Sequence, residues 1–565
     1  ESEEIRECLG AGMFLGKMIK AEPRIVYRWP PCPEEAAGND VGSQMPNFLF
    51  PFGFFIKDIS GGELDMNTKE SNGPPTSPDR SRANFDGFNH NLINQLTQEY
   101  IFKDQIGSER WRSFFLSFNS EETLTLDRGI VHPVLRSANP NMYYTYYCVI
   151  TEELVAIEGE RFVSCPRVYL LKSMYPFREL FGDLLHSIVD DRRAKRLESI
   201  AAVENDTKTQ LVSDKLSKEL IRMSSKEDAW EDIKASLEIL SKKTTVPLPG
   251  QVLSGVMQKR NLTFHIPAEK ELKLQNMIEN AMELLPLFSF SDYLFVLASV
   301  LRERTVIFVS EERRTLSMAV EYFSNIIKPL SWPFPVIYSL PDNCLEILAS
   351  PVPLIAGILQ SAEKTINEII PEYAAATREA VFVLIDQKYV LADKATVSST
   401  RMPRLSKTLV PLHDSIKPLF HSASSNTISY SPKSNDFARK SNSKLTFKNP
   451  LNQSNHLISK RLENQHWHEI ANYLEGLEKA FSEAFDVGRD FRGDKEAAEK
   501  QINDRLGPKD AQFLSVFLST QTFAYYLQQR TINSMRYIEQ GEYLISKFDK
   551  GRKEVEGIDH DKEEY

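Results

Sequence analysis

Residues 293–310 of the chain read YLFVLASVLRERTVIFVS, and this stretch decides the fold class. Its first part is apolar at helical spacing and belongs to a predicted helix, Ser291–Glu303, for which Ser291 is the expected N-cap. Its second part, Thr305–Val309, predicts a strand because β-branched and aromatic residues fill it. A helix that leads directly into an apolar strand is typical of α/β proteins.

The region from 270 to 390 repeats this alternation of helix and strand. Strands are expected at Thr305–Val309, Pro335–Ser339, Leu354–Leu359 and Ala380–Ile385, and helices at Glu269–Leu284, Ser291–Glu303, Glu312–Ile327, Cys344–Leu348 and near Ile366–Ala375. The strands lack a regular alternation of polar and apolar residues. We therefore predict a parallel sheet that is covered on both faces.

The first 190 residues have a different pattern, with several aromatic strands followed by one amphipathic helix. We predict a short helix at Glu4–Lys20, an apolar run of strand character at Pro46–Ile56, strands at Trp111–Phe118, Tyr143–Ile150, Arg161–Ser164 and Arg167–Leu171, and a helix at Phe177–Val189. This order predicts a separate α+β or α/β module.

Two further regions complete the chain. Ten of the forty residues in 421–460 are serine, and apolar residues are few, so this segment is predicted to be a disordered linker. Its Ser431-Pro432 pair is read either as a phosphorylation site or as part of a passive tether. Residues 465–550 carry apolar residues at helical spacing and predict a helical module.

Composition narrows the function. A chain of 565 residues exceeds the roughly 250–300 that one core supports, so two to four domains are expected. The formal net charge of -10 argues against a general nucleic-acid binder, whose phosphate contacts need a basic surface. Five cysteines without CxxC spacing indicate neither a disulfide framework nor a zinc site, and they suit a reducing compartment. No segment is apolar enough to predict a membrane span.

Motifs for covalent chemistry are missing from the sequence. There is no GxxxxGK[ST] loop, no GxGxxG after a strand, no HExxH and no GxSxG. Three weaker patterns are interpreted as structural and not as a metal site, an acid–base pair or a nucleophile. They are the pair His466 and His468, the acidic residues around His186, and Cys344, which we expect to be a buried thiol. We therefore predict no catalytic residue, no metal and no cofactor, and favour a binding or regulatory protein.

Four segments in one order carry a family resemblance. Residues 293–310 resemble the central signature of the DENN domain, and 327–341 (IKPLSWPFPVIYSLP) resemble its P-L-x-W…P-x-L-P segment. Residues 349–358 (ASPVPLIAGI) are similar to the A-P-x-P-x-x-x-G segment, and 381–386 (VFVLID) to the hydrophobic strand that ends in Asp.

The resemblance implies a multi-domain α/β protein with a longin-like α+β module, a flavodoxin-like parallel-sheet module and an all-helical C-terminal module. The expected boundaries are 1–190 for the upstream part with an insertion at about 58–110, 191–250 for a helical connector, 251–420 for the central part, 421–460 for the disordered Ser/Asn-rich linker, 461–550 for the downstream part and 551–565 for a charged tail. It also implies that the protein binds a Rab-type small GTPase and promotes release of GDP.

The carboxyl ends of parallel strands suggest where the GTPase binds, since ligands of open parallel sheets tend to lie there. The predicted GTPase-binding residues are Ser310, Glu311, Leu340, Pro341, Asp342, Ser350, Pro351 and Asp386. The other interpretation of the prolines is that they only shape turns.

Two alternatives to nucleotide exchange stay open. One is a GTPase-activating protein that supplies an arginine, with Arg112 or Arg128 as the candidate. The other is a scaffold that keeps the DENN fold without exchange activity. The expected location is the cytoplasm, with recruitment to vesicle or endosomal membranes through the GTPase.

Overall fold

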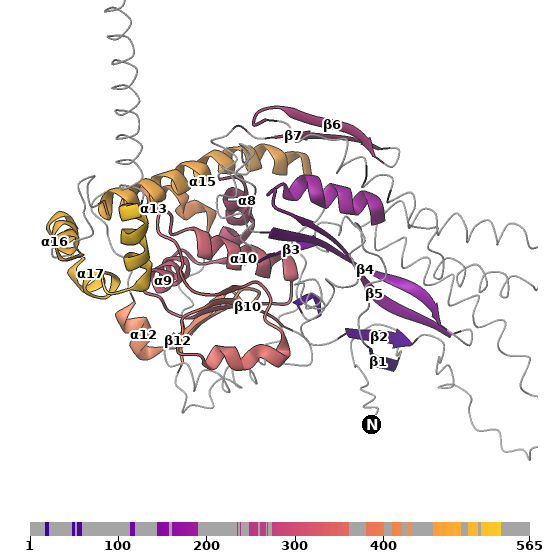
Figure 1. Cartoon of the computed structure of the whole chain (residues 1–565), viewed down its shortest axis with the longest axis horizontal. Helices are drawn as coiled ribbons and strands as arrows, with labels where there is room; N and C mark the ends of the chain where they lie inside the picture. Colours follow the sequence, from indigo (N-terminus) through magenta and orange to yellow (C-terminus); the bar gives the residue numbers. More distant parts are fainter. Residues whose placement is uncertain are drawn as a thin grey trace, which may run out of the picture.

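The structure, a computed structural model, describes only part of the 565-residue chain. The described residues are 17–21, 48–50, 54–58, 113–118, 144–157, 161–189, 248–257, 260–266, 274–360, 380–400, 409–420, 428–430, 456–486, 495–506 and 510–532, with the single residues 234, 238 and 268. They form a central sheet, an upstream sheet, a small two-stranded sheet and the helices that pack on them (Figure 1).

The central sheet has six strands in the order β13-β12-β11-β8-β10-β9. In chain order these are β8 (Val306–Ser310), β9 (Val336–Ile337), β10 (Ile355–Leu359), β11 (Val381–Leu384), β12 (Tyr389–Asp393) and β13 (Ile428–Tyr430). Strands β9, β10, β8 and β11 are parallel, which confirms the predicted parallel sheet. Strand β12 runs antiparallel to β11, and neither β12 nor β13 was predicted.

Both faces of β8, β10 and β11 are buried, whereas the edge strand β9 is half-buried. Along β8, Val306 and Phe308 belong to a large core cluster that includes residues of helices α9 (Phe290–Leu301) and α10 (Arg313–Asn325). Ile307 and Val309 belong to a second cluster, together with Leu345 and Leu348 of the 3-10 segment η6 (Asp342–Ala349). Because each face of β8 packs against an apolar layer, its sequence lacks the alternation of polar and apolar residues that a half-exposed strand has.

Helix α9 begins two residues earlier than predicted. Ser289, which is 4% exposed, is its N-cap, and the Ser289 Oγ accepts a hydrogen bond from the Asp292 backbone N–H at 3.1 Å. Ser291, the predicted N-cap, therefore lies inside the helix. Both serines satisfy the sequence rule for a cap, and only the backbone geometry separates them.

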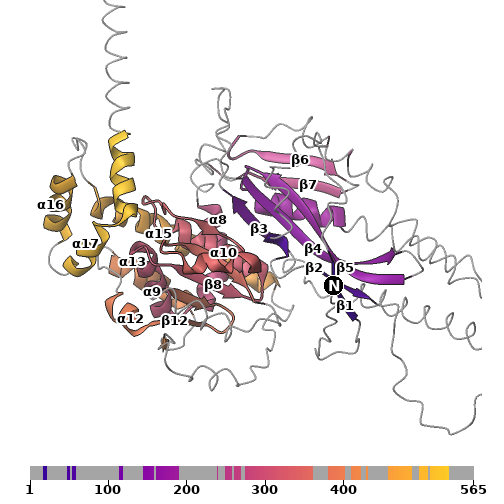
Figure 2. The same ribbon diagram turned by 60° about the horizontal axis from the view of Figure 1, so that its bottom comes forward.

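The upstream sheet is antiparallel and lies beside the central module (Figure 2). Its order is β1-β2-β5-β4-β3, with β1 at Lys17–Ala21, β2 at Phe54–Asp58, β3 at Ser113–Phe118, β4 at Tyr144–Ile157 and β5 at Arg161–Ser173. The two short strands predicted at Arg161–Ser164 and Arg167–Leu171 are one strand, β5, which pairs with β4 along its whole length. A helix over residues 178–189 covers one face of this sheet, where the rings of Tyr147 and Phe181 lie 4.8 Å apart.

Strand β1 corrects the helix predicted at Glu4–Lys20. Residues Lys17–Ala21 pair in antiparallel register with Phe54–Asp58 of β2. Pairing across the sheet satisfies the backbone groups of this segment, and it overrides the weak local preference for a helix. The remainder of the predicted helix lies outside the described residues.

A hairpin that was not predicted packs on the upstream module. Its strands are β6 (Val252–Met257) and β7 (Arg260–His265). Phe264 of β7 lies 5.2 Å from the ring of Phe177, at the start of the helix over 178–189. The hairpin thus joins that helix in a small separate cluster with Leu180 and Ile266.

The C-terminal region is helical, as predicted. It comprises α15 (His456–Ala484), α16 (Lys495–Leu506), α17 (Ala511–Phe517) and a helix over residues 521–532. Its α15 shares the central core, because the hydroxyl of Tyr473 lies 3.0 Å from that of Tyr293, which lies 3.1 Å from that of Tyr322. All three rings are fully buried.

The predicted disordered linker needs a correction at both ends. Residues Ile428–Tyr430 form the edge strand β13, which pairs with β12 in parallel register. Helix α15 begins at His456, before the expected end of the linker at 460. The rule that failed was compositional: a serine-rich average over forty residues hides a short β-prone triplet such as Ile-Ser-Tyr.

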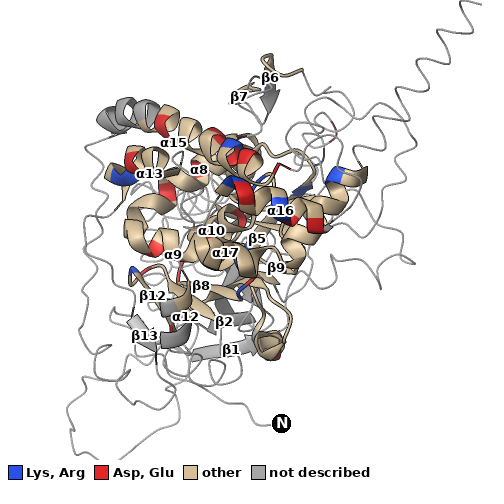
Figure 3. Cartoon of the chain, turned by 90° about the vertical axis from the view of Figure 1, so that its left-hand side faces the viewer, with Lys and Arg blue, Asp and Glu red and all other residues tan. Residues whose placement is uncertain are grey.

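The chain is therefore a mixed α/β protein with a parallel-strand sheet and a C-terminal helical region. In the part that the structure describes, every helix is either too short or too polar to cross a lipid bilayer. Figure 3 shows acidic and basic residues interspersed along α15 and α16, so the described surface of these helices carries both signs of charge side by side.

Candidate functional site

The carboxyl ends of β8 and β11 are joined by one aspartate. Asp386, just after β11, accepts hydrogen bonds from the Ser310 hydroxyl at 3.0 Å and from the Glu311 backbone N–H at 2.7 Å. Ser310 is completely buried, and its Oγ accepts a further bond from the Glu312 backbone N–H at 3.1 Å. The Glu311 side chain is exposed. We call the group Ser310, Glu311, Leu340, Pro341 and Asp386 the carboxyl edge.

Burial sets the electrostatics at this edge. It raises the pKa of Asp386, and the hydrogen bonds from Glu311 and Ser310 oppose that shift. Burial also raises the pKa of Glu312, where the hydroxyl of Thr315 donates to the carboxylate and opposes the shift. The exposed side chain of Glu311 thus lies beside two partly buried carboxyl groups, Asp386 of the carboxyl edge and the neighbouring Glu312.

Leu340 and Pro341 lie on the same side of the sheet but point inward. The Leu340 backbone N–H donates to the carbonyl of Gly357 in β10 at 2.8 Å, and both Leu340 and Pro341 are buried. Pro341 precedes η6, and its carbonyl accepts from the Cys344 backbone N–H at 2.9 Å. These two residues therefore shape the edge instead of presenting side chains to solvent. Asp342 begins η6, and its side chain is not among the described ones.

Ser350 and Pro351 lie at the opposite end of the sheet. They precede β10, whose amino end is tied to β8 by a 2.9 Å hydrogen bond from Val306 to Leu354. Pro351 is exposed, and the Ser350 Oγ accepts from the Val352 backbone N–H at 3.2 Å. The structure therefore separates the predicted site residues into two groups. Ser310, Glu311, Leu340, Pro341 and Asp386 lie at the carboxyl ends of the strands, whereas Ser350 and Pro351 lie at the amino end of β10.

Two arginines next to the carboxyl edge reach the upstream module, and sequence reasoning missed them. Arg313 donates to the carbonyl of Leu49 at 3.4 Å. Arg314 donates to Ser113 of β3 at 3.4 Å and forms an ion pair with Glu283 at 2.6 Å. Ser113 is 201 positions from Arg314 in the sequence, so no local sequence pattern predicts this contact. The carboxyl edge consequently adjoins the junction of the two modules.

A buried ion pair holds that junction together. Arg178 forms an ion pair with Glu321 of α10, donates to the Asn280 side-chain oxygen at 2.6 Å, and lies over the ring of Phe115 at 3.9 Å. Burial lowers the pKa of Arg178, and the charge of Glu279 opposes this shift. Two modules distant in sequence are thus joined by a guanidinium group that is paired, hydrogen-bonded and stacked.

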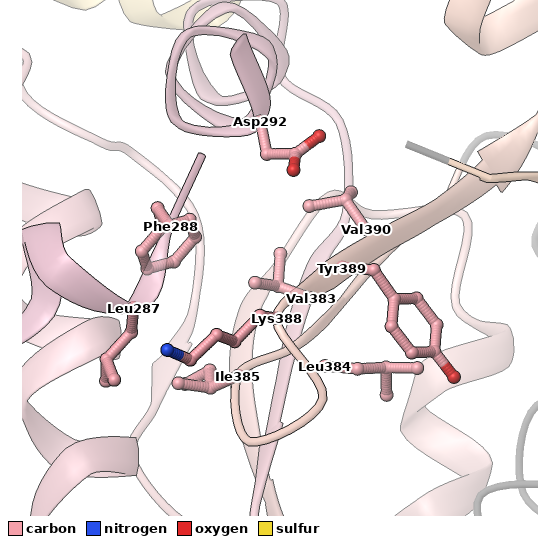
Figure 4. Close-up of a pocket in the computed structure, with 9 residues that line it drawn as sticks. All are labelled: Leu287, Phe288, Asp292, Val383, Leu384, Ile385, Lys388, Tyr389 and Val390. Atoms are coloured by element: carbon pink, nitrogen blue, oxygen red, sulfur yellow. The ribbon is translucent and has the colours of Figure 1, made fainter. Parts of the chain in front are cut away.

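A small hollow lies beside the turn that carries Asp386 (Figure 4). It is lined by Leu287, Phe288, Asp292, Val383, Leu384, Ile385, Lys388, Tyr389 and Val390. The turn over 385–388, which carries Asp386, forms one wall, and the start of α9 forms the other. Figure 4 shows the Lys388 side chain extending across the hollow toward Leu287.

The weaker patterns of the sequence do not assemble into a chemical site. Among the described residues, no group of three or more His, Cys, Asp or Glu side chains is placed to hold a metal ion. His466 lies 3.3 Å from Glu469, one turn along α15. Cys344 is exposed, which corrects the expectation of a buried thiol. In the 3-10 segment η6 the buried face carries Leu345 and Leu348, which are three residues apart, and Cys344 lies off that face. The candidate arginines Arg112 and Arg128 lie outside the described residues.

The chain was compared with known families and proteins. Residues 164–388 match the family model "DENN (AEX-3) domain". This range runs from β5 through the parallel sheet to the turn at Lys388, and it contains all eight predicted binding residues. Residues 164–388 form a DENN domain.

Several DENN-domain proteins resemble parts of this chain. The DENN domain-containing protein 2A of Mus musculus is 36% identical over 74 residues, or 13% of this chain and 7% of that protein. The DENN domain-containing protein 2B of Homo sapiens is 34% identical over 79 residues, 14% of this chain and 7% of that protein. The MAP kinase-activating death domain protein of Drosophila melanogaster is 33% identical over 132 residues, 22% of this chain and 6% of that protein. The match to this chain thus spans only about 7% of the length of the first of these relatives.

Proposed function

We propose that this protein is a guanine-nucleotide exchange factor for a Rab-type small GTPase and acts in membrane trafficking. The observation that carries the proposal is the DENN domain at 164–388, whose parallel sheet ends in the carboxyl edge. We also propose that the upstream sheet with its helix is longin-like and that the central sheet module is flavodoxin-like. The protein would then be cytoplasmic and reach vesicle or endosomal membranes through the GTPase.

Exchange of nucleotide needs no covalent chemistry. A factor that binds the nucleotide-free GTPase more tightly than the GDP form weakens GDP binding by the same ratio. Equal affinity for both states would change nothing. The working surface must therefore offer a contact that becomes favourable only after GDP has left.

An exposed carboxylate supplies such a contact. Loss of GDP leaves the phosphate-binding lysine of a small GTPase without its anion. Glu311 is exposed at the carboxyl edge, and its backbone is fixed by the hydrogen bond to Asp386. We propose that Glu311 meets this positive charge, while Ser310 and Asp386 hold its backbone in place.

The remaining predicted residues have supporting roles in the proposal. Leu340, Pro341 and Asp342 would fix the contour of the carboxyl edge, because the first two are buried. Ser350 and Pro351 would contact the same GTPase only if the partner reaches the opposite end of the sheet. The junction beside Arg313 would place the upstream module against the GTPase as well.

The test is release of a fluorescent GDP analogue from a panel of purified Rab GTPases. We expect the protein to accelerate release from one or a few members, and Glu311→Gln to reduce this by about tenfold, the factor for about 1.4 kcal/mol of lost contact with a charged group. Glu478→Gln on α15 is the matched control, since Glu478 is also exposed but lies on the C-terminal helical region.

The outcomes separate the alternatives. Faster GTP hydrolysis without faster GDP release would replace the proposal by a GTPase-activating protein. Binding to the nucleotide-free GTPase without faster release would leave a scaffold. An equal loss of activity in both glutamate variants would remove Glu311 from the mechanism.

A further inference from the structure

A glutamate of the DENN domain caps a helix in the C-terminal region. Glu303 follows α9 and has a φ of 55°, a left-handed conformation that is uncommon outside glycine. Its Oε1 accepts a hydrogen bond from the Thr522 backbone N–H at 2.5 Å, across 219 positions of sequence. Thr520 accepts from the Phe523 backbone N–H at 3.2 Å. The helix over 521–532 thus begins with one cap of its own and one from the central module.

The two neighbours of Glu303 also bind outside their own helix. Arg302 donates to the carbonyl of Ser399, at the end of α12 (Lys394–Ser399). Arg304, which is 8% exposed, donates to the hydroxyls of Thr396 and Ser399 at 3.2 Å each. The turn after α9 is therefore held by α12 from one side and meets the C-terminal region through Glu303 on the other.

The other end of α9 meets both the C-terminal region and the hollow beside the turn over 385–388. Tyr293, in its first turn, is hydrogen-bonded through its hydroxyl to Tyr473 of α15 at 3.0 Å. Asp292 and Phe288 line the hollow whose opposite wall is the turn over 385–388. Figure 1 shows α9 packed between the central sheet and the C-terminal helices. The C-terminal region thus contacts both ends of a helix that abuts the candidate site.

We propose that Glu303 is a positioning residue through which the C-terminal helical region holds α9, and with it the turn that carries Asp386. Its carboxylate caps the helix over 521–532, and α9 transmits the placement of that helix along its 12 residues to the hollow. A helix of this length spans about 18 Å and moves as one element. The expected effect on GDP release rests on the proposed exchange function, whereas the expected connection from Glu303 through α9 to the hollow does not.

The test uses two variants of Glu303 that differ in one property. Glu303→Gln keeps the length of the side chain and an oxygen that accepts from Thr522, whereas Glu303→Met keeps the length and loses the acceptor. Both replace the residue by an unbranched side chain at the same positive φ, so backbone strain is matched. Amide hydrogen exchange of the full chain is measured for the wild type and both variants, followed by GDP release from the responsive GTPase.

We expect Glu303→Met to speed exchange at the amides of Thr522 and Phe523 by about tenfold, the effect of losing one helix cap. Exchange should also rise by about threefold at Lys388, whose backbone N–H donates to Ile385 at 3.1 Å, because the hollow loses its fixed wall. GDP release should fall in parallel. Glu303→Gln should stay within about threefold of the wild type at each position.

Three results would overturn the inference. Unchanged exchange at Thr522 in Glu303→Met would remove the cap. Faster exchange at Thr522 with no change at Lys388 would remove the connection to the candidate site. Equal loss in the Gln and Met variants would show that the accepting oxygen is not what matters. If the wild type accelerates GDP release from no GTPase, the proposed function fails, while amide exchange still decides the connection.

Discussion

Replacing Gly357 by alanine should loosen β9 from the central sheet and disturb the carboxyl edge. A Cβ atom at position 357 would overlap the backbone oxygen of Tyr338 and lie 2.8 Å from Cγ of Leu316. The Leu316 side chain can turn aside, but the Tyr338 carbonyl belongs to the backbone beside β10. The substitution should therefore push this segment away and break the 2.8 Å hydrogen bond from Leu340 to the Gly357 carbonyl.

The size of the effect follows from two opposing terms. Overpacking a well-packed core costs about 1–3 kcal/mol, and a backbone clash belongs at the upper end. Replacing glycine restricts the unfolded chain and returns about 0.4–1 kcal/mol. The net destabilisation is about 2 kcal/mol, which should speed amide exchange at Leu340 by about 30-fold.

Amide hydrogen exchange at Leu340 measures this effect locally, and Gly182→Ala is the matched control. Nothing lies within 4 Å of a Cβ at position 182, in the helix over 178–189, so alanine there should stabilise the helix by about 1 kcal/mol. If Gly357→Ala leaves exchange at Leu340 unchanged, the close approach of these backbones does not limit this part of the sheet.

Three further predictions follow from the buried polar groups. Tyr473→Phe removes one of three linked hydroxyls and should lower the free energy of unfolding by about 1 kcal/mol, as measured by urea unfolding, because Tyr293 keeps its bond to Tyr322; no change would mean that the link contributes nothing. Arg178→Met leaves the largely buried Glu321 with only its hydrogen bond from Asn280 and should cost about 3 kcal/mol, the lower end for a broken buried pair. The Arg178→Met/Glu321→Leu double variant should recover much of this loss in a double-mutant cycle, and additive losses would contradict a coupled pair. Because the pKa of Asp386 is raised, the folded state binds the proton more tightly than the unfolded state. The contribution of Asp386 to stability is therefore greatest at low pH, and it declines as the pH rises from the ordinary pKa of 3.8 through the raised one. Asp386→Asn should flatten this decline in the free energy of unfolding measured against pH, and an unaltered profile would exclude Asp386 as its source.

The central sheet was predictable because its strands carry their own signal. The apolar stretch Val306–Ser310 is buried on both faces, and such strands show continuous hydrophobicity. Strand β12 was missed because it follows β11 after a tight turn and ends in Asp393, which caps α12. β13 was missed because three residues are too few to form a pattern.

The candidate site was only partly predictable for a geometric reason. The sequence shows where strands end, so Ser310 and Asp386 were predicted at one edge of the sheet, where a hydrogen bond joins their side chains. It does not show that Ser350 and Pro351 precede their strand and lie at the other end of the sheet. Contacts such as Arg314 with Ser113, or Glu303 with Thr522, join residues about 200 positions apart. Such contacts depend on how the modules pack, and no spacing rule encodes them.

The most direct test of the account is the amide-exchange footprint of a nucleotide-free Rab GTPase on this chain. The account predicts protection of the backbone amides at residues 311–313, 340 and 385–388, weaker protection with the GDP-bound GTPase, and a weaker footprint in Glu311→Gln. Protection confined to the amides of Ser350 and Val352, or an equal footprint with the GDP-bound and nucleotide-free forms, would contradict the claim that the carboxyl edge drives exchange.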